Sequence, residues 1–249
     1  MNLGGKIALV TGSSRGIGAA TAKMLAKHGA AVAVNYVNSK EAAENVVADI
    51  VKHGGKAIAF QADVRKKDEV DQMLAEITRE LGPIDILVLN AGAKVPFKPF
   101  IELTYDEFKN KVLGELDGFF HPLKGVIPSM IQRKKGIIVG ISSGLSRHPG
   151  YGFSAHTTAK SGIDGLMKSL ALELGPKGIR VNTIAPGLTM TDATSWLPPE
   201  QIKRSAETTP LRRVGHPEDI AGAVLMIVSD EAGFISGAYI PVSGGTQMP

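Results

Sequence analysis

The sequence contains no cysteine among its 249 residues. Without thiols the chain can form no disulfide, no thiolate nucleophile and no thiolate metal site, which excludes a disulfide-stapled secreted scaffold. It also lacks an apolar run long enough for a membrane-spanning helix, and its opening residues lack the apolar stretch and cleavage site of a signal peptide. We therefore expect a cytoplasmic protein with no membrane partner.

An excess of charge of one sign is lacking as well. Lysine and arginine outnumber aspartate and glutamate by only 4, and the basic residues are spread along the chain. Their one cluster, Arg133 to Lys135, is interpreted as a solvated helix end near the negative pole of the helix dipole. We expect no nucleic-acid partner. No histidine pattern has the spacing of metal ligands, so no metal site is predicted.

Short apolar runs alternate with longer helical patterns along the chain. The runs are apolar on both faces, as parallel strands covered by helices must be, and they span 7–11, 31–36, 57–63, 84–90, 137–141, 181–185 and 238–242. The helical patterns span roughly 16–28, 40–53, 67–81, 104–133, 154–174 and 217–229. This alternation predicts an α/β fold of the Rossmann type: a doubly wound sheet of about seven parallel strands with helices on both faces. The whole of 1–249 is expected to form a single domain.

The stretch 187–210 is the least regular part of the chain. It holds three prolines and the only tryptophan, and it follows the C-terminal end of a predicted strand. Loops at that end of a strand gather around ligands in this fold. A substrate lid and an ordinary surface loop are both open for this segment. The candidates for the wall of an apolar pocket are Phe97, Phe100, Leu145, Phe153, Trp196 and Leu197.

A glycine-rich loop follows the first predicted strand and leads into a helix. Glycines in such a loop let the backbone approach a pyrophosphate, and the helix N-terminus adds free N–H groups and a positive dipole end. The strand, loop and helix together predict a dinucleotide-binding site, formed by Gly12, Ser14, Arg15, Gly16, Ile17 and Gly18.

The end of the second predicted strand indicates which dinucleotide binds. It carries Asn35 and Tyr36, at the place where an acidic residue binds the ribose of a cofactor that lacks a 2′-phosphate. Arg15 in the loop and Ser39 just after the strand supply a cation and a hydroxyl instead. We therefore include Asn35, Tyr36 and Ser39 in the predicted site, and the pattern favours NADP(H).

Further motifs close the later strands, and together with the loop they produce a resemblance. Asp63-Val64 ends the third strand, Asn90-Ala91-Gly92 the fourth, and the run from Arg180 to Gly187 forms the sixth strand and its exit. With these motifs the chain, from Lys6 to Gly245, resembles the short-chain dehydrogenase/reductase family, and within it the bacterial 3-oxoacyl-carrier-protein reductases.

The resemblance implies further cofactor contacts. Asp63 and Val64 would contact the adenine, and the Asn90-Ala91-Gly92 motif would lie beside the adenosine, partly as structural support. The nicotinamide would be flanked by Pro186, Gly187 and Thr189. Lys160 would hold the nicotinamide ribose.

Two of the family's four catalytic positions hold other residues in this chain. The resemblance places the catalytic lysine at Lys160 and the serine at Ser143, with Ser142 as the less favoured neighbour. The tyrosine position, four residues before the lysine, holds His156, and the asparagine position holds Glu115. The identity of the proton donor therefore decides what the protein can do.

His156 and Lys160 share one helix face because they are four residues apart. Histidine is a common general acid–base with an ordinary pKa of about 6.5. Lys160 would lower that pKa, whereas Glu115, if close, would raise it and orient the ring. We hypothesise a His156–Glu115 pair that acts as an altered acid–base and moves the pH optimum to neutral or lower pH. Two alternatives stay open: a satisfied histidine in a silent pocket, and a phenol supplied by Tyr151.

The sequence therefore predicts an NADP(H)-dependent oxidoreductase that moves a hydride between nicotinamide and a small ketone or secondary alcohol. One alternative keeps the fold and cofactor but performs isomerase, dehydratase or enoyl-reductase chemistry. Another is a catalytically silent nucleotide-binding protein. The resemblance also implies a homotetramer that pairs the helices 104–133 and 154–174. Ser243 stands where an aspartate is common in the family, so a second interface is expected to differ.

Overall fold

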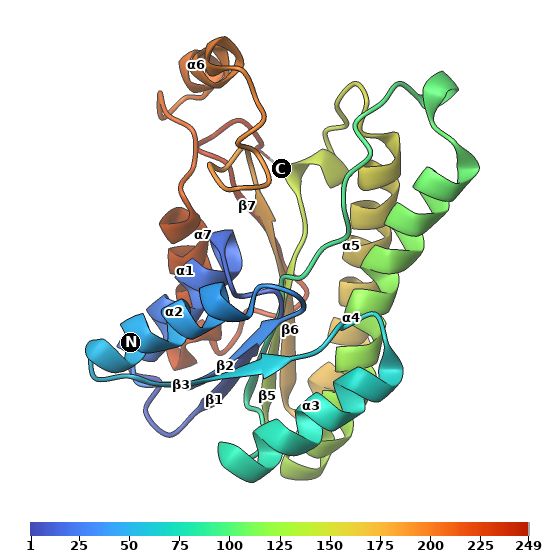
Figure 1. Cartoon of the computed structure of the whole chain (residues 1–249). Helices are drawn as coiled ribbons and strands as arrows, with labels where there is room; N and C mark the ends of the chain where they lie inside the picture. Colours follow the sequence, from blue (N-terminus) through green and yellow to red (C-terminus); the bar gives the residue numbers. More distant parts are fainter. Residues whose placement is uncertain (249) are drawn as a thin grey trace.

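Seven strands form one parallel sheet in the computed structural model, which describes residues 1–248 (Figure 1). The strands run in the order β3-β2-β1-β4-β5-β6-β7, with bounds β1 Ile7–Val10, β2 Ala31–Tyr36, β3 Lys56–Gln61, β4 Ile86–Leu89, β5 Gly136–Ile141, β6 Ile179–Pro186 and β7 Tyr239–Val242. The helices are α1 Gly16–Lys27, α2 Lys40–Lys52, α3 Lys67–Glu80, α4 Tyr105–Arg133, α5 Ser154–Leu174, α6 Pro199–Thr208 and α7 Pro217–Val228. The strand order reverses between β1 and β4, where open α/β sheets bind ligands beyond the carboxyl ends of their strands.

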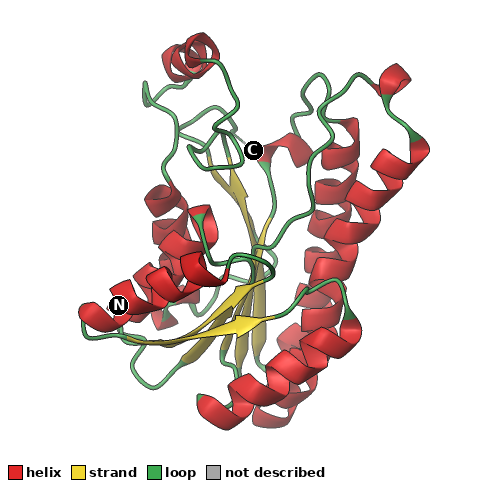
Figure 2. Ribbon diagram, in the orientation of Figure 1, coloured by secondary structure: helices red, strands yellow, loops and turns green. Residues whose placement is uncertain are grey.

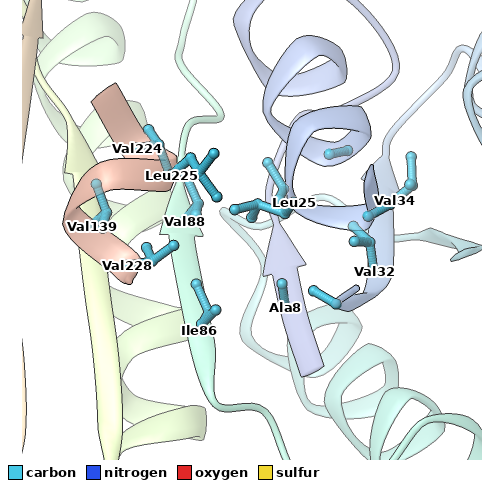
Figure 3. Close-up of a cluster of buried hydrophobic side chains, with 14 of the residues drawn as sticks. Ala8, Leu25, Val32, Val34, Ile86, Val88, Val139, Val224, Leu225 and Val228 are labelled. Atoms are coloured by element: carbon cyan, nitrogen blue, oxygen red, sulfur yellow. The ribbon is translucent and has the colours of Figure 1, made fainter. Parts of the chain in front are cut away.

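Helices cover both faces of the sheet (Figure 2). The helices α1, α2 and α7 pack on one face, and α3, α4 and α5 pack on the other. Successive strand residues divide between the two layers: in β1, Ala8 and Val10 face the first core and Leu9 faces the second. Figure 3 shows the first core, where side chains of the central strands meet those of α1 and α7. The predicted doubly wound fold is confirmed.

The long helices α4 and α5 pack side by side and carry three of the four predicted catalytic positions, Glu115, His156 and Lys160 (Figure 1). A capping box starts α4: Glu107 N donates to Thr104 Oγ1 at 3.2 Å, and Thr104 N donates to Glu107 Oε2 at 3.0 Å. Such reciprocal bonds satisfy two of the N–H groups that a helix start leaves free. On α5, Ala155 and Ala159 are buried beside Lys160, so small side chains let this helix pack closely. The two helices thus form a fixed frame for the site.

The stretch 187–210 contains a helix that was not predicted. The helix α6 begins at Pro199 and ends at Thr208, and the other elements lie within two residues of their predicted bounds. Proline suits the first position of a helix, but Pro198-Pro199 also has the pattern of a loop. None of the α6 residues is buried, and the helix stands apart from the sheet (Figure 1). No helix within residues 1–248 combines the length and the apolar character needed to cross a bilayer.

The central position of β4 leads to a stability prediction. Val88 in β4 is fully buried, so we expect Val88→Ala to lower the free energy of unfolding by about 2 kcal/mol. The matched change Val51→Ala, on α2 at 55% exposure, should alter it by less than about 0.5 kcal/mol. Urea denaturation followed by circular dichroism measures both variants. Equal losses in the two variants would contradict this arrangement of the core.

Candidate active site

Two asparagines hold the glycine-rich loop between β1 and α1. Asn35 is fully buried; its Oδ1 accepts from Gly12 N at 3.0 Å and its Nδ2 donates to Ala62 O at 3.0 Å. Asn90 Nδ2 donates to the carbonyl oxygens of Thr11 and Gly12, both at 3.0 Å. Gly12 itself has a φ of 60°, which glycine adopts without steric cost. The side chain of Asn35 therefore supports the loop from within the protein, and its predicted contact with the cofactor stays a prediction. Asn90 has the predicted supporting role.

The start of α1 offers a site for a phosphate group. A Cβ on Gly18 would lie 2.5 Å from Gly12 O and 2.6 Å from Asn90 Nδ2, so only glycine allows the helix to pack this closely on the loop. No side chain caps α1, which leaves its first N–H groups available to an anion. The residues present therefore fit the pyrophosphate of a dinucleotide. The partly or fully exposed residues at this opening are Ser14, Arg15, Gly16 and Ile17.

Arg15 and Ser39 meet beyond the end of β2. The Arg15 guanidinium donates from Nη2 to Ser39 Oγ, and its side chain is more than half exposed. Tyr36, the last residue of β2, is buried. An accessible cation and a hydroxyl therefore lie together here, as the sequence predicted. Asp192 of the stretch 187–210 approaches the same guanidinium, with 3.6 Å between its carboxylate and Nη1.

The other predicted cofactor residues lie at the same edge of the sheet. Asp63 follows β3, and its carboxylate accepts from Arg65 Nε at 2.8 Å and from Nη2 at 2.6 Å. These hydrogen bonds from Arg65 hold the pKa of the Asp63 carboxyl below its ordinary value. Its carboxylate is therefore committed to Arg65, and Val64 beside it is buried. The remaining residues follow β4 or lie at the end of β6 and beyond it: Ala91, Gly92, Pro186, Gly187 and Thr189.

Lys160 and Glu115 meet between the two long helices. His156 and Lys160 lie one turn apart on α5. Lys160 is only 6% exposed, and its Nζ donates to Ile141 O at the end of β5 at 2.8 Å. The same Nζ lies 2.5 Å from Oε1 of Glu115, which is fully buried on α4. The structure thus brings two of the predicted catalytic positions into an ion pair.

Glu115 also binds a second lysine, which the sequence analysis did not select. Lys111 lies one turn earlier on α4, and its Nζ is 2.5 Å from Glu115 Oε2. It also donates to Ala93 O at 2.8 Å, while Ala93 N donates to Glu115 Oε2 at 3.1 Å. A lysine and a glutamate four residues apart ordinarily form an exposed pair, so no pattern marks this one. Its burial, with Lys111 at 2% exposure, sets it apart.

The charged groups of this cluster, Lys111, Glu115 and Lys160, act together on the pKa values of Glu115 and Lys111. Burial opposes the ionisation of Glu115, but the ammonium groups of Lys160 and Lys111 outweigh it and lower the pKa of the carboxyl to about 2. The pKa of Lys111 is lowered as well, mainly by burial and further by Lys160, although Glu115 opposes the shift. The cluster is therefore a carboxylate held between two cations.

The predicted hydrogen-bonded pair of His156 and Glu115 does not form. The lysines engage both oxygens of Glu115, and the buried Nδ1 of His156 has no hydrogen-bond partner. Charged donors bind a carboxylate more strongly than neutral ones, so the ammonium groups displace the imidazole. His156 does not join a metal cluster either, since no three His, Cys, Asp or Glu within residues 1–248 are grouped as metal ligands would be.

The surroundings of His156 keep its imidazole neutral. Burial lowers its pKa to about 3, with further lowering by Lys111 and Lys160. Glu115 raises the pKa, as predicted, but by too little to offset these effects. At neutral pH the ring therefore has one N–H donor and one acceptor nitrogen.

The loop after β5 carries both candidate serines. Ser143 is partly exposed, and its Oγ accepts from Leu145 N at 3.2 Å, which leaves its hydroxyl free to donate. Ser142 is buried, and its Oγ has no hydrogen-bond partner. Accessibility therefore favours Ser143. The alternative phenol, Tyr151, is 81% exposed and lies outside the buried cluster.

The stretch 187–210 contacts both halves of the site. The ring of Trp196 lies 5.3 Å from that of Phe97, which lies 4.9 Å from Phe153. The Phe153 ring in turn lies 6.2 Å from the His156 ring. With Asp192 beside the glycine-rich loop, the stretch reaches from that loop to the aromatic side chains next to His156. Its role as a substrate lid stays a prediction.

Comparisons with known proteins decide the family. The family model described as enoyl-(acyl carrier protein) reductase matches residues 12–247. The 3-oxoacyl-[acyl-carrier-protein] reductase FabG of Staphylococcus epidermidis is 38% identical over 243 residues, which cover 98% of this chain and 99% of that protein. The chain belongs to the short-chain dehydrogenase/reductase family.

Other members of the family match over nearly their whole length. The 7alpha-hydroxysteroid dehydrogenase of Escherichia coli is 37% identical over 246 residues, or 98% of this chain and 95% of that protein. A structure of 7 alpha-hydroxysteroid dehydrogenase complexed with NADH and 7-oxo glycochenodeoxycholic acid has a TM-score of 0.92 at 36% identity, covering 98% of this chain and 95% of its own. A short-chain type dehydrogenase/reductase from Mycobacterium marinum has a TM-score of 0.91 at 34% identity, covering 100% and 98%. This short-chain dehydrogenase/reductase is therefore an oxidoreductase by family.

We expect the His156 imidazole of this short-chain dehydrogenase/reductase to titrate with a midpoint of about 3. Because the folded pKa lies below the ordinary value of 6.5, the neutral ring contributes its full stability above pH 6.5 and loses it as the pH falls toward 3. Nitrogen NMR of labelled imidazoles measures the midpoint, and His156→Gln identifies the signal. The same variant should lose less stability than the parent across this pH window. A midpoint near 6.5 would contradict the buried, cation-flanked ring.

Proposed function

We propose that the protein is an NADP(H)-dependent carbonyl reductase that moves a hydride between nicotinamide and a ketone or secondary alcohol. The observation that carries this proposal is the placement of His156 and Lys160 of α5, with Ser143 after β5, at the sheet edge that holds the glycine-rich loop. Two relatives that match nearly the whole chain are named for chemistry at an oxo or hydroxyl carbon. That kinship supports a small carbonyl or alcohol substrate.

The preference for NADP(H) rests on Arg15 and Ser39. They form an exposed cation–hydroxyl pair at the end of β2, and β2 itself ends without an acidic residue that would bind the ribose hydroxyls of NAD(H). Asp192, 3.6 Å from the guanidinium, would have to give way to the 2′-phosphate. A guanidinium and a hydroxyl suit the 2′-phosphate, since arginine binds phosphate through two parallel N–H groups. Lys160 supports the other end of the cofactor: its Nζ donates to Ile141 O and is ion-paired with Glu115, and an ammonium has three N–H donors, which allows a further one to bind the nicotinamide ribose.

The proton chemistry belongs to side chains of this chain. The nicotinamide, when bound, supplies or accepts the hydride. Ser143 Oγ and the neutral N–H of His156 donate hydrogen bonds to the substrate oxygen and polarise the carbonyl, as a neutral imidazole can. The proton that completes the alcohol leaves the His156 ring, and water entering the site returns a proton to the ring. The Lys160 ammonium, one turn away on α5, stabilises the negative charge that the ring carries in between.

Reduction of a conjugated double bond is the second candidate. The matching family model is described as an enoyl reductase. The ammonium groups of Lys111 and Lys160 act on the same ring, as their effect on the pKa of His156 shows. Such positive surroundings suit the negative charge that develops on the oxygen of an enolate. The fold and the cofactor would be the same in both reactions.

The homotetramer and the cytoplasmic location also stay proposals. On α4, Leu113 and Phe120 are 46% and 51% exposed, and on α5 Leu172 is 81% exposed. Apolar side chains on the outer surface of these two helices support an assembly that pairs them.

NADPH oxidation over a panel of ketones and enones tests the proposed function. We expect the parent to turn over at least one ketone, and His156→Tyr to change the rate at least tenfold, about 1.4 kcal/mol in the barrier, or to change the preferred substrate. His53→Tyr is the matched control, because His53 is exposed at the end of α2, and its rates should equal those of the parent. Turnover confined to enones would favour the second candidate.

Two outcomes would contradict the proposal. A parent without turnover that His156→Tyr activates would overturn the role of His156. NADPH binding without turnover in both the parent and His156→Tyr would indicate a silent nucleotide-binding protein.

We expect Arg15→Ala to weaken NADPH binding at least tenfold and to leave NADH binding within about twofold, since only the 2′-phosphate loses a partner. Titration of the reduced nicotinamide fluorescence measures both dissociation constants. The matched control is Arg79→Ala, on α3, where the arginine pairs only with its neighbour Glu80. Equal losses for the two cofactors would contradict the assignment of Arg15.

A further inference from the structure

Three charged side chains form a buried chain from α4 to α5. Lys111, Glu115 and Lys160 are 2%, 0% and 6% exposed, and each lysine Nζ lies 2.5 Å from a different oxygen of Glu115. Lys111 and Glu115 also bracket the Ala93 peptide, one through its carbonyl and the other through its N–H. Ala93 directly follows the Asn90-Ala91-Gly92 motif. These three charged side chains therefore join the segment that follows β4, at the sheet edge of the glycine-rich loop, to α5, the helix that carries His156.

The three side chains Lys111, Glu115 and Lys160 together carry one net positive charge. If Glu115 were paired with Lys160 alone, their charges would cancel and no net charge would lie beside His156. The ammonium of Lys111 restores the net charge of plus one. The Lys111–Glu115 pair is thus neutral as a unit, like the asparagine side chain whose position Glu115 occupies.

We propose that Lys111 and Glu115 act as one positioning unit, in which Lys111 holds the Glu115 carboxylate against Lys160 and maintains one net positive charge beside His156. The inference rests on the proposed function only in its assignment of His156 and Lys160 as the catalytic groups. Lys111 acts through Glu115, so it is a positioning residue. The Lys111 ammonium donates to Ala93 O and Glu115 Oε2, and neither residue belongs to the glycine-rich loop between β1 and α1.

Each single substitution changes the net charge of Lys111, Glu115 and Lys160 in a different direction. In Lys111→Met, Glu115 and Lys160 cancel, and His156 loses a neighbouring cation. In Glu115→Gln, two buried ammonium groups remain 2.5 Å from an amide that carries no charge to pair with them, which disfavours the protonated state of both. In the double variant, which combines Lys111→Met and Glu115→Gln, Lys160 is the one charged group of the three. It lies beside a neutral amide, and the net charge returns to plus one.

The charged groups that act on His156 are Lys111 and Glu115 from α4 and Lys160 from its own helix. The pKa of the His156 ring therefore reports on a double-mutant cycle of the parent, the two single variants and the double variant. We expect its pKa to rise in Lys111→Met and to fall in Glu115→Gln. In the double variant it should return to between these two values and close to the parent. A merely structural role for the pair would not produce this order.

The cycle is measured with the full chain. For the parent, Lys111→Met, Glu115→Gln and the double variant, the imidazole NMR midpoint, the NADPH dissociation constant and kcat with KM on the best substrate are determined. We expect each single change to lower kcat at least tenfold, and the double variant to recover at least tenfold over the weaker single variant. KM should change less than kcat, because the pair does not touch the substrate. Lys111→Arg, which keeps the charge, should retain the His156 midpoint and most of kcat.

An exposed pair of the same spacing provides the control. Lys67 and Asp71 are four residues apart on α3, with their side chains 69% and 51% exposed, and the cycle of Lys67→Met and Asp71→Asn should show no coupling. Additive losses at Lys111 and Glu115, or one His156 midpoint in all four proteins, would overturn the proposal. If the chain reduces no carbonyl, the proposed function fails, yet the His156 midpoints still decide the inference. Should a single variant not fold, the midpoints of Lys111→Arg and the double variant decide it, and a midpoint in the double variant far from the parent would refute it.

Discussion

The buried carboxylate of Glu115 is the group on which the rest of the site depends. It lies within 2.5 Å of two ammonium nitrogens, and none of its surface reaches solvent. A buried ion without a partner costs several kcal/mol (on the order of 3–5 when one partner is removed), so each of the three charges requires the others. Because they come from α4 and α5 and hold the Ala93 peptide, one charge cluster joins both helices to the end of β4.

Burial and this cluster together determine the charge state of the His156 ring. A histidine beside a free carboxylate would be an imidazolium, a strong acid near neutral pH. Here the carboxylate is shared by two lysines, and burial lowers the pKa of the ring to about 3, with help from those cations. At neutral pH the ring is therefore uncharged, with one N–H donor and one acceptor nitrogen, beside a net positive charge. The ring also packs against Phe153, and Phe97 and Trp196 continue this row of aromatic side chains.

The fold was largely predictable because it depends on local patterns. Buried parallel strands are apolar on both faces and helices have a repeat near 3.6, so both can be recognised within a window of 10–20 residues. The reversal of strand order between β1 and β4 then places the glycine-rich loop at the ligand edge. The helix α6 was missed because Pro198-Pro199 has the pattern of a loop and the ten helix residues are mostly polar, with none of them buried.

The sequence by itself determined the order of the elements, the strand–loop–helix that fits a pyrophosphate, and the spacing that places His156 and Lys160 one turn apart on α5. The tertiary structure decided which groups those side chains meet. Asn35 supports Gly12 from within the protein, and Glu115 binds Lys111 and Lys160 instead of His156. The reason is physical: the energy of a buried polar group depends on how much water is excluded and on which other polar and charged groups lie within a few ångströms. Both follow from the packing of segments distant in the chain, which local spacing does not specify.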